Sequence, residues 1–154
     1  PLVADRRLEV MEDFISDAIS SGGEVISGGG RGQSPGSFFE PTLIRDVPDT
    51  AKIMIEEPFG PVAPSASFSS IDEIIERANS LPFGLASYAF TSNPRTSQIL
   101  KSEIESGMLA INSMHIHSVE TPFGGLKHSG YGYEGSIEGL EAFLVTKYSS
   151  EIYT

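Results

Sequence analysis

The chain has 154 residues, a net charge of −11 and no cysteine. This length suits one domain with a hydrophobic core, and the negative charge disfavours binding to the phosphate backbone of nucleic acids. The sequence contains no apolar run of about 18 residues, which a membrane-spanning helix needs. Disulfides are excluded, and the absence of cysteine favours a reducing compartment. We therefore expect a domain that binds neither nucleic acid nor membrane, in a cytoplasmic protein.

The first third of the chain predicts one helix followed by extended segments. Apolar residues recur at helical spacing from about Ala4, and the pair Gly22-Gly23 suits a C-terminal cap. After this helix we expect a strand at 24–27, a glycine-rich loop at 28–37 and an extended segment at 38–47.

Strands and helices alternate in the middle of the chain. The predicted strands lie at 62–68, 85–91 and 108–111, with helices that start after Ser70 and Asn93. Such crossovers predict a mostly parallel sheet with helices on its faces, so the expected fold class is α/β. A last helix at 136–143 and a protruding strand at 144–150 complete the prediction.

Three short runs carry more information than the elements around them. The run at 122–135 reads PFGGLKHSGYGYEG. Its glycines permit positive φ angles and close approach of backbone to backbone or to a ligand, although their density alone also fits a tight surface loop. The other two runs are EEPFGPV at 56–62 and GMLAIN at 107–112.

In this order and spacing, the three runs resemble the NAD(P)-dependent aldehyde dehydrogenase superfamily. The resemblance extends to about residue 148 and implies that 1–143 are the carboxy-terminal part of the catalytic domain. Residues 144–154 would be an oligomerisation strand and tail, through which the parent protein forms a homo-oligomer. The implied parent enzyme oxidises an aldehyde to a carboxylic acid with NAD or NADP.

The chemistry implied by the resemblance needs groups that this chain lacks. In the family, a cysteine thiolate forms a thiohemiacetal with the aldehyde, hydride passes to NAD(P), and water hydrolyses the thioester. The chain has no cysteine, and no G-x-G-x-x-G run follows a strand and opens a helix. The nucleophile, the general base and the dinucleotide domain would therefore lie upstream of Pro1. No catalytic residue is assigned here, and the chain alone is expected to be inactive.

Glu57 and Phe59 are the candidate cofactor-binding residues. The resemblance implies that Glu57 accepts hydrogen bonds from the nicotinamide ribose hydroxyls, for which a carboxylate is suited. It implies that Phe59 packs near the nicotinamide ring, although a core phenylalanine is the other interpretation. Pro58 differs from the aliphatic residue usual in this motif and restricts Glu57 to extended conformations.

His117, Ser118 and Phe123 are the candidate substrate-binding residues. Phe123 resembles the aromatic residue that lines the aldehyde tunnel, and the loop at 113–121 shapes substrate choice in the family. Ser118-Val119-Glu120 is similar to succinate-semialdehyde dehydrogenases, where a serine hydroxyl and upstream arginines hold the substrate carboxylate. His115 and His117 have no suitably spaced third metal ligand, so we expect loop histidines and no metal site.

The remaining motif residues are expected to be structural. We predict that Asn112 ends its strand and that Lys127 and Ser129 brace the glycine-rich loop. Tyr133 stands where the family more often has arginine, so part of this bracing would be missing. The alternative to an enzyme fragment is a non-catalytic module that assembles through its tail strand.

Overall fold

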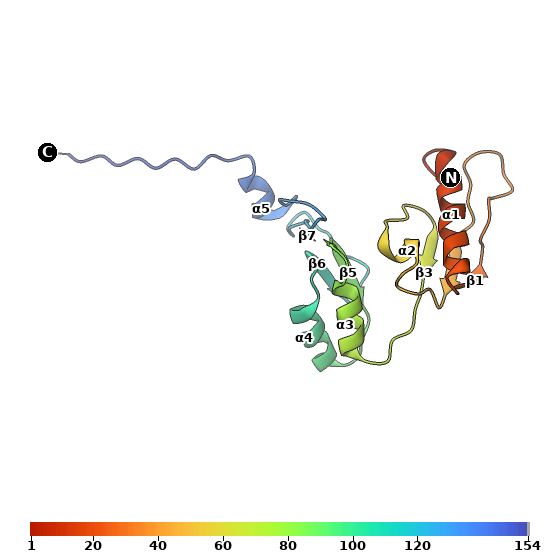
Figure 1. Cartoon of the computed structure of the whole chain (residues 1–154). Helices are drawn as coiled ribbons and strands as arrows, with labels where there is room; N and C mark the ends of the chain where they lie inside the picture. Colours follow the sequence, from red (N-terminus) through yellow and green to blue (C-terminus); the bar gives the residue numbers. More distant parts are fainter. Residues whose placement is uncertain (154) are drawn as a thin grey trace. The chain divides into compact units, whose positions relative to one another are not determined.

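The computed structural model describes residues 1–153, and the chain divides into two compact units, Pro1–Ser69 and Ser70–Thr154 (Figure 1). The first unit contains α1 (Arg6–Ser20), β1 (Glu24–Ser27), β2 (Thr42–Arg45), α2 (Lys52–Ile55) and β3 (Val62–Pro64). The second contains α3 (Ile71–Asn79), β4 (Phe83–Gly84), β5 (Ala86–Ala89), α4 (Pro94–Glu103), β6 (Met108–Ile111), β7 (Leu126–Lys127) and α5 (Ser136–Glu141). These elements confirm the α/β class.

Helix α1 supplies most of the core of the first unit. Its residues Met11, Phe14 and Ala18 recur at helical spacing and are buried, as are Ile44 of β2 and nearby apolar residues. The helix ends as predicted, because the amide of Gly23 donates to the carbonyl of Ala18 at 2.8 Å.

The strands form three small sheets rather than one. In the first unit the order is β1-β2-β3, with β1 antiparallel and β3 parallel to β2. In the second unit β5 pairs with β6 in parallel, and β4 pairs with β7 antiparallel. The expected parallel pairings are therefore present. However, the boundary between the units falls between β3 and α3, so β3 joins the strands before it and not β5.

The helices of the second unit begin at the predicted caps. The hydroxyl of Ser70 accepts the amide of Glu73 at 3.2 Å, and the side chain of Asn93 accepts the amide of Arg95 at 2.9 Å. Figure 1 shows α3 and α4 beside the β5–β6 pair. The core here is thin, since Leu100 of α4 is buried but α3 has no fully buried residue.

Two further features differ from the sequence-based expectation. The single turn of α2, which carries Ile53 into the core, was not predicted. The predicted strand at 144–150 is absent from the described residues, because a strand is stabilised by a hydrogen-bonded neighbour and this segment has none in the single chain. It is instead an exposed, extended tail that follows α5 (Figure 1).

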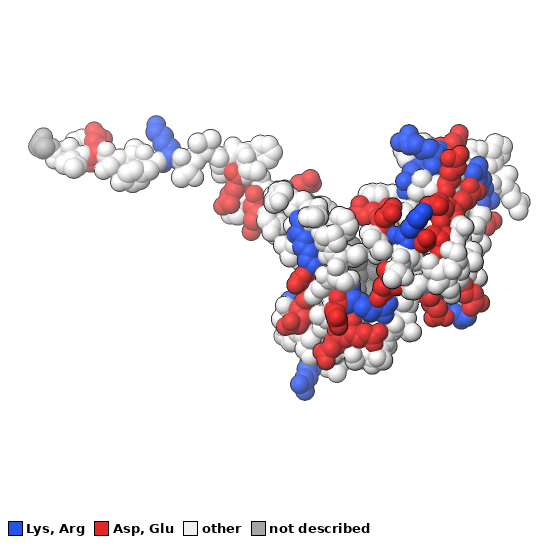
Figure 2. Space-filling model, viewed as in Figure 1, with Lys and Arg blue, Asp and Glu red and all other residues white. Residues whose placement is uncertain are grey.

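The surface carries its charge in a scattered pattern. On the face shown in Figure 2, acidic side chains occur on both units and are interspersed with Lys and Arg rather than gathered in one block. Within residues 1–153, no helix is both long and apolar enough to cross a membrane.

Candidate functional site

The loop 56–61, between α2 and β3, presents the two candidate cofactor-binding residues. Both of its ends are fixed by the backbone. The amide of Glu56 donates to the carbonyl of Lys52 at 2.8 Å, and the carbonyl of Pro61 accepts the amide of Thr42 at 2.8 Å.

Between these ends, Glu57 is exposed and Phe59 is 76% exposed. Phe59 is therefore not part of the buried core of the first unit. A carboxylate and an aromatic ring, two residues apart, are both open to solvent.

Helix α1 holds this loop in an uncommon backbone conformation. Phe59 has a φ of +40°, a region that non-glycine residues rarely adopt. The guanidinium of Arg7 donates to the carbonyl of Pro58 and, at 3.5 Å, to the carbonyl of Phe59. Met11 packs against Gly60, where an added Cβ would lie 3.1 Å from the Met11 Cε. The contacts of Arg7 and Met11 with this loop were not predicted from the sequence.

The glycine-rich motif of the second unit surrounds a hollow of about 310 Å³. Its lining includes Phe123, Tyr133 and Gly124. The amides and carbonyls of Phe123 and Glu134 exchange two hydrogen bonds of 2.8 Å, which closes the loop. A Cβ at Gly124 would lie 2.5 Å from Cδ1 of Tyr133. The tyrosine ring thus packs over a glycine of the motif.

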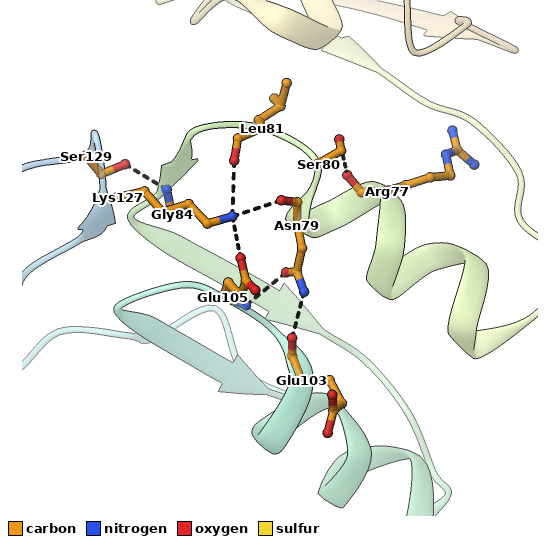
Figure 3. A network of polar contacts seen from close by, with 9 residues as sticks. All are labelled: Arg77, Asn79, Ser80, Leu81, Gly84, Glu103, Glu105, Lys127 and Ser129. Carbon is orange, nitrogen blue, oxygen red and sulfur yellow. Dashed lines mark hydrogen bonds and ion pairs between the residues drawn. The ribbon is translucent and has the colours of Figure 1, made fainter.

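Lys127 and Ser129 brace this motif, as predicted, against the turn after α3 (Figure 3). The Ser129 hydroxyl accepts the amide of Gly84 at 2.9 Å. The Lys127 ammonium group has three acceptors: the carbonyls of Asn79 at 2.8 Å and Leu81 at 3.1 Å, and the Glu105 carboxylate at 2.6 Å.

The structure brings two of the three candidate substrate residues together. The rings of His117 and Phe123 meet edge to face, with centroids 5.4 Å apart and an interplanar angle of 85°. Phe123 is half-buried against the hollow, whereas His117 is exposed. Among residues 1–153, no group of three or more His, Asp or Glu side chains is arranged to hold a metal ion.

Ser118 lies in a turn of its own. Its amide donates to the hydroxyl of Thr121 at 3.0 Å, and the same hydroxyl donates to the Ser118 carbonyl at 3.1 Å. A hydrogen bond from the Ser118 hydroxyl, with a smaller effect of the backbone amide, lowers the pKa of Glu120 below its ordinary value. The Ser118 hydroxyl thus interacts with Glu120, and it also lies 3.4 Å from the hydroxyl of Thr121. Neither contact was predicted from the sequence.

Asn112 has the structural role predicted for it. Its φ is +56°, its side-chain oxygen accepts the amide of Thr91 at 2.7 Å, and its side-chain amide donates to the Thr91 carbonyl at 2.8 Å. The side chain therefore joins the segments that follow β5 and β6.

Known proteins match both the sequence and the fold. The aldehyde dehydrogenase family matches residues 1–149. A probable NADP(+)-dependent succinate-semialdehyde dehydrogenase of Sinorhizobium fredii is 43% identical over 148 residues, and a 3-sulfolactaldehyde dehydrogenase of Pseudomonas putida is 42% identical. Both alignments cover 96% of this chain and 30% of the relative.

Among solved structures, the succinate-semialdehyde dehydrogenase from Burkholderia pseudomallei is similar to this chain with a TM-score of 0.91 and 36% identity. The similarity covers 94% of this chain and 30% of that one. The chain therefore belongs to the aldehyde dehydrogenase family, and it spans about 30% of the length of these relatives.

Proposed function

We propose that the chain is the carboxy-terminal part of the catalytic domain of an NAD(P)-dependent aldehyde dehydrogenase. The family match over residues 1–149 carries this proposal. The parent enzyme would oxidise an aldehyde to a carboxylic acid. Residues 1–143 would belong to the catalytic domain and 144–154 to an oligomerisation segment.

Glu57 and Phe59 would hold the nicotinamide half of the cofactor. The chemistry of loop 56–61 fits this ligand, since an exposed carboxylate can accept from two neighbouring ribose hydroxyls and an exposed ring can cover an apolar face. NAD or NADP, when bound, accepts the hydride of the substrate. Glu57 would orient the ribose, and Phe59 would exclude water from the nicotinamide side.

The substrate would be a small aldehyde with an anionic group at its other end. Two relatives support this class by name, one for succinate semialdehyde and one for 3-sulfolactaldehyde. Phe123 would form the apolar wall, with His117 at its edge and the Ser118 hydroxyl as a donor to the anionic end. Because Ser118 also hydrogen-bonds Glu120, substrate binding would have to redirect its hydroxyl.

The parent protein would be a cytoplasmic homo-oligomer that assembles through the tail. The tail is exposed and carries apolar side chains, with Val145 93% and Tyr148 88% exposed. Such groups are unusual on a surface that stays in water, and an extended segment can pair with a strand of another copy.

The proposal is tested with the full-length parent enzyme and two aldehydes of equal length, succinate semialdehyde and a neutral analogue. Reduction of NAD or NADP should follow, with a preference for the anionic aldehyde. Ser118→Ala should lower this preference about tenfold, the effect of one hydrogen bond to a charged group. Ser34→Ala, an exposed serine in the loop between β1 and β2, is the control and should leave the ratio unchanged. An unchanged ratio in Ser118→Ala would reject the role of this residue, and no cofactor reduction with any aldehyde would reject the activity.

A further inference from the structure

We infer that Arg7 is a positioning residue for loop 56–61: from helix α1 it fixes the backbone between the two side chains that would bind the cofactor. The inference rests on the proposed function of Glu57 and Phe59. It concerns a residue outside the motif, 51 positions from the nearer contact in the sequence.

Arg7 contacts the carbonyl groups on both sides of the Phe59 α-carbon. Its Nη2 donates to the carbonyl of Pro58 and, at 3.5 Å, to that of Phe59. The first carbonyl belongs to the peptide plane that sets φ of Phe59, and the second to the plane that sets ψ. A planar, permanently charged guanidinium group is suited to hold two such acceptors at once.

The conformation that Arg7 holds would not persist without support. Phe59 has a φ of +40°, which is strained for a residue with a side chain, and such strain is found where surrounding contacts over-determine the backbone. Pro58 limits Glu57 to extended conformations. A change at Phe59 would therefore move the ring relative to the Glu57 carboxylate.

Helix α1 is a rigid base for this contact. Met11, one turn after Arg7 on the same face of the helix, is 0% exposed and packs against Gly60. The loop is thus held at two successive points, by a polar contact and by an apolar one. Precise positioning of a binding residue requires support of this kind from a well-packed element.

The neighbouring arginine provides a matched control. Arg6 is exposed, and its side chain makes no hydrogen bond or ion pair with residues 1–153. Arg6→Gln and Arg7→Gln remove the same charge from the same helical turn. A difference between them therefore reports the contacts with the loop and not the charge of the helix.

The experiment measures the Kd of NAD+ and of NADP+ by calorimetry, without aldehyde, on the full-length parent enzyme. Arg7→Gln should weaken binding of the preferred cofactor about tenfold, Arg7→Lys should recover part of the loss, and Arg6→Gln should have no effect. In a background that carries both Glu57→Gln and Phe59→Ala, Arg7→Gln should cost little more, because Arg7 acts through the positions of those two side chains.

The outcomes separate this inference from the proposed function. If Glu57→Gln weakens binding and Arg7→Gln does not, the inference is wrong and the function stands. If Arg7→Gln costs as much in that background as in the wild type, Arg7 acts independently of the two side chains, and the inference is also wrong. If neither variant alters the Kd, loop 56–61 is not the cofactor site. Should Arg7→Gln fail to fold, the comparison of Arg7→Lys with Arg6→Lys decides in the same way.

Discussion

The ammonium group of Lys127 and the carboxylate of Glu105 form an ion pair of 2.6 Å that joins the glycine-rich motif to the segment before β6. The same ammonium group donates to the carbonyls of Asn79 and Leu81 at 2.8 and 3.1 Å (Figure 3). A single side chain from the motif thus satisfies three acceptors that belong to other segments of the second unit. Lys127, together with Ser129, therefore holds this motif against the rest of the second unit.

Lys127→Met should destabilise the second unit. The substitution keeps the aliphatic stem but removes all three contacts, so we expect a loss of about 1–2 kcal/mol in the free energy of unfolding. Urea unfolding followed by circular dichroism measures this value. Lys101→Met, on the exposed face of α4, is the control and should have no measurable effect. Equal unfolding midpoints for the two variants would show that the bracing contributes nothing.

Ser118→Ala should raise the pKa of Glu120 toward its ordinary value. The Ser118 hydroxyl stabilises the charged carboxylate, so the lowered pKa of the folded state means stability that is present above the unfolded pKa and lost as the pH falls through the folded pKa. Titration of the Glu120 carboxyl carbon by NMR in wild type and variant measures the shift. Glu138, whose pKa is lowered by Ser136, serves as an internal reference that should not move. If the variant leaves the titration of Glu120 unchanged, the Ser118 hydroxyl does not stabilise this carboxylate.

The isolated chain should not oxidise aldehydes. It contains no cysteine that could attack the substrate. Purified chain, NAD or NADP and a panel of aldehydes should give no more reduced cofactor than buffer alone. Turnover above that baseline, retained through further purification, would contradict the expectation.

Deleting residues 144–154 should change the association state. With the tail intact, we expect a dimer or larger assembly at micromolar concentration, because the exposed apolar segment can pair with another copy. The truncated chain should shift toward monomer or aggregate without a defined size. Sedimentation velocity distinguishes these results. A monomer with the tail intact would reject the proposed role, and an oligomer unchanged by the truncation would place the interface elsewhere.

Local signals predicted the elements that are stabilised locally. Helical periodicity found α1, and the caps Ser70 and Asn93 marked the starts of α3 and α4. The single turn of α2 was not predicted because four residues are too few to show a helical period. Its position depends instead on the burial of Ile53. That β3 and β5 belong to different sheets was not predicted, because strand order is decided by contacts between segments far apart in the sequence.

The motifs identified the exposed loop with Glu57 and the brace at Lys127, but not their long-range partners. Arg7 donates to a loop 51 residues away, and no short pattern in the sequence encodes such a contact. In the tail, by contrast, the sequence predicts an element that residues 144–150 do not form in the structure. Its alternating pattern predicts a strand, but a strand needs a neighbour, which the single chain does not provide.

The rate of hydride transfer in Glu57→Gln, measured by rapid mixing on the full-length parent enzyme, tests the central claim most directly. Glu56→Gln is the matched control, because it makes the same chemical change at the adjacent exposed residue. We predict that Glu57→Gln slows hydride transfer about tenfold or more, equivalent to ~1.4 kcal/mol, while aldehyde binding changes little and Glu56→Gln behaves as wild type. An unchanged rate in Glu57→Gln, or an equal loss in both variants, would contradict the assignment of this loop to the cofactor.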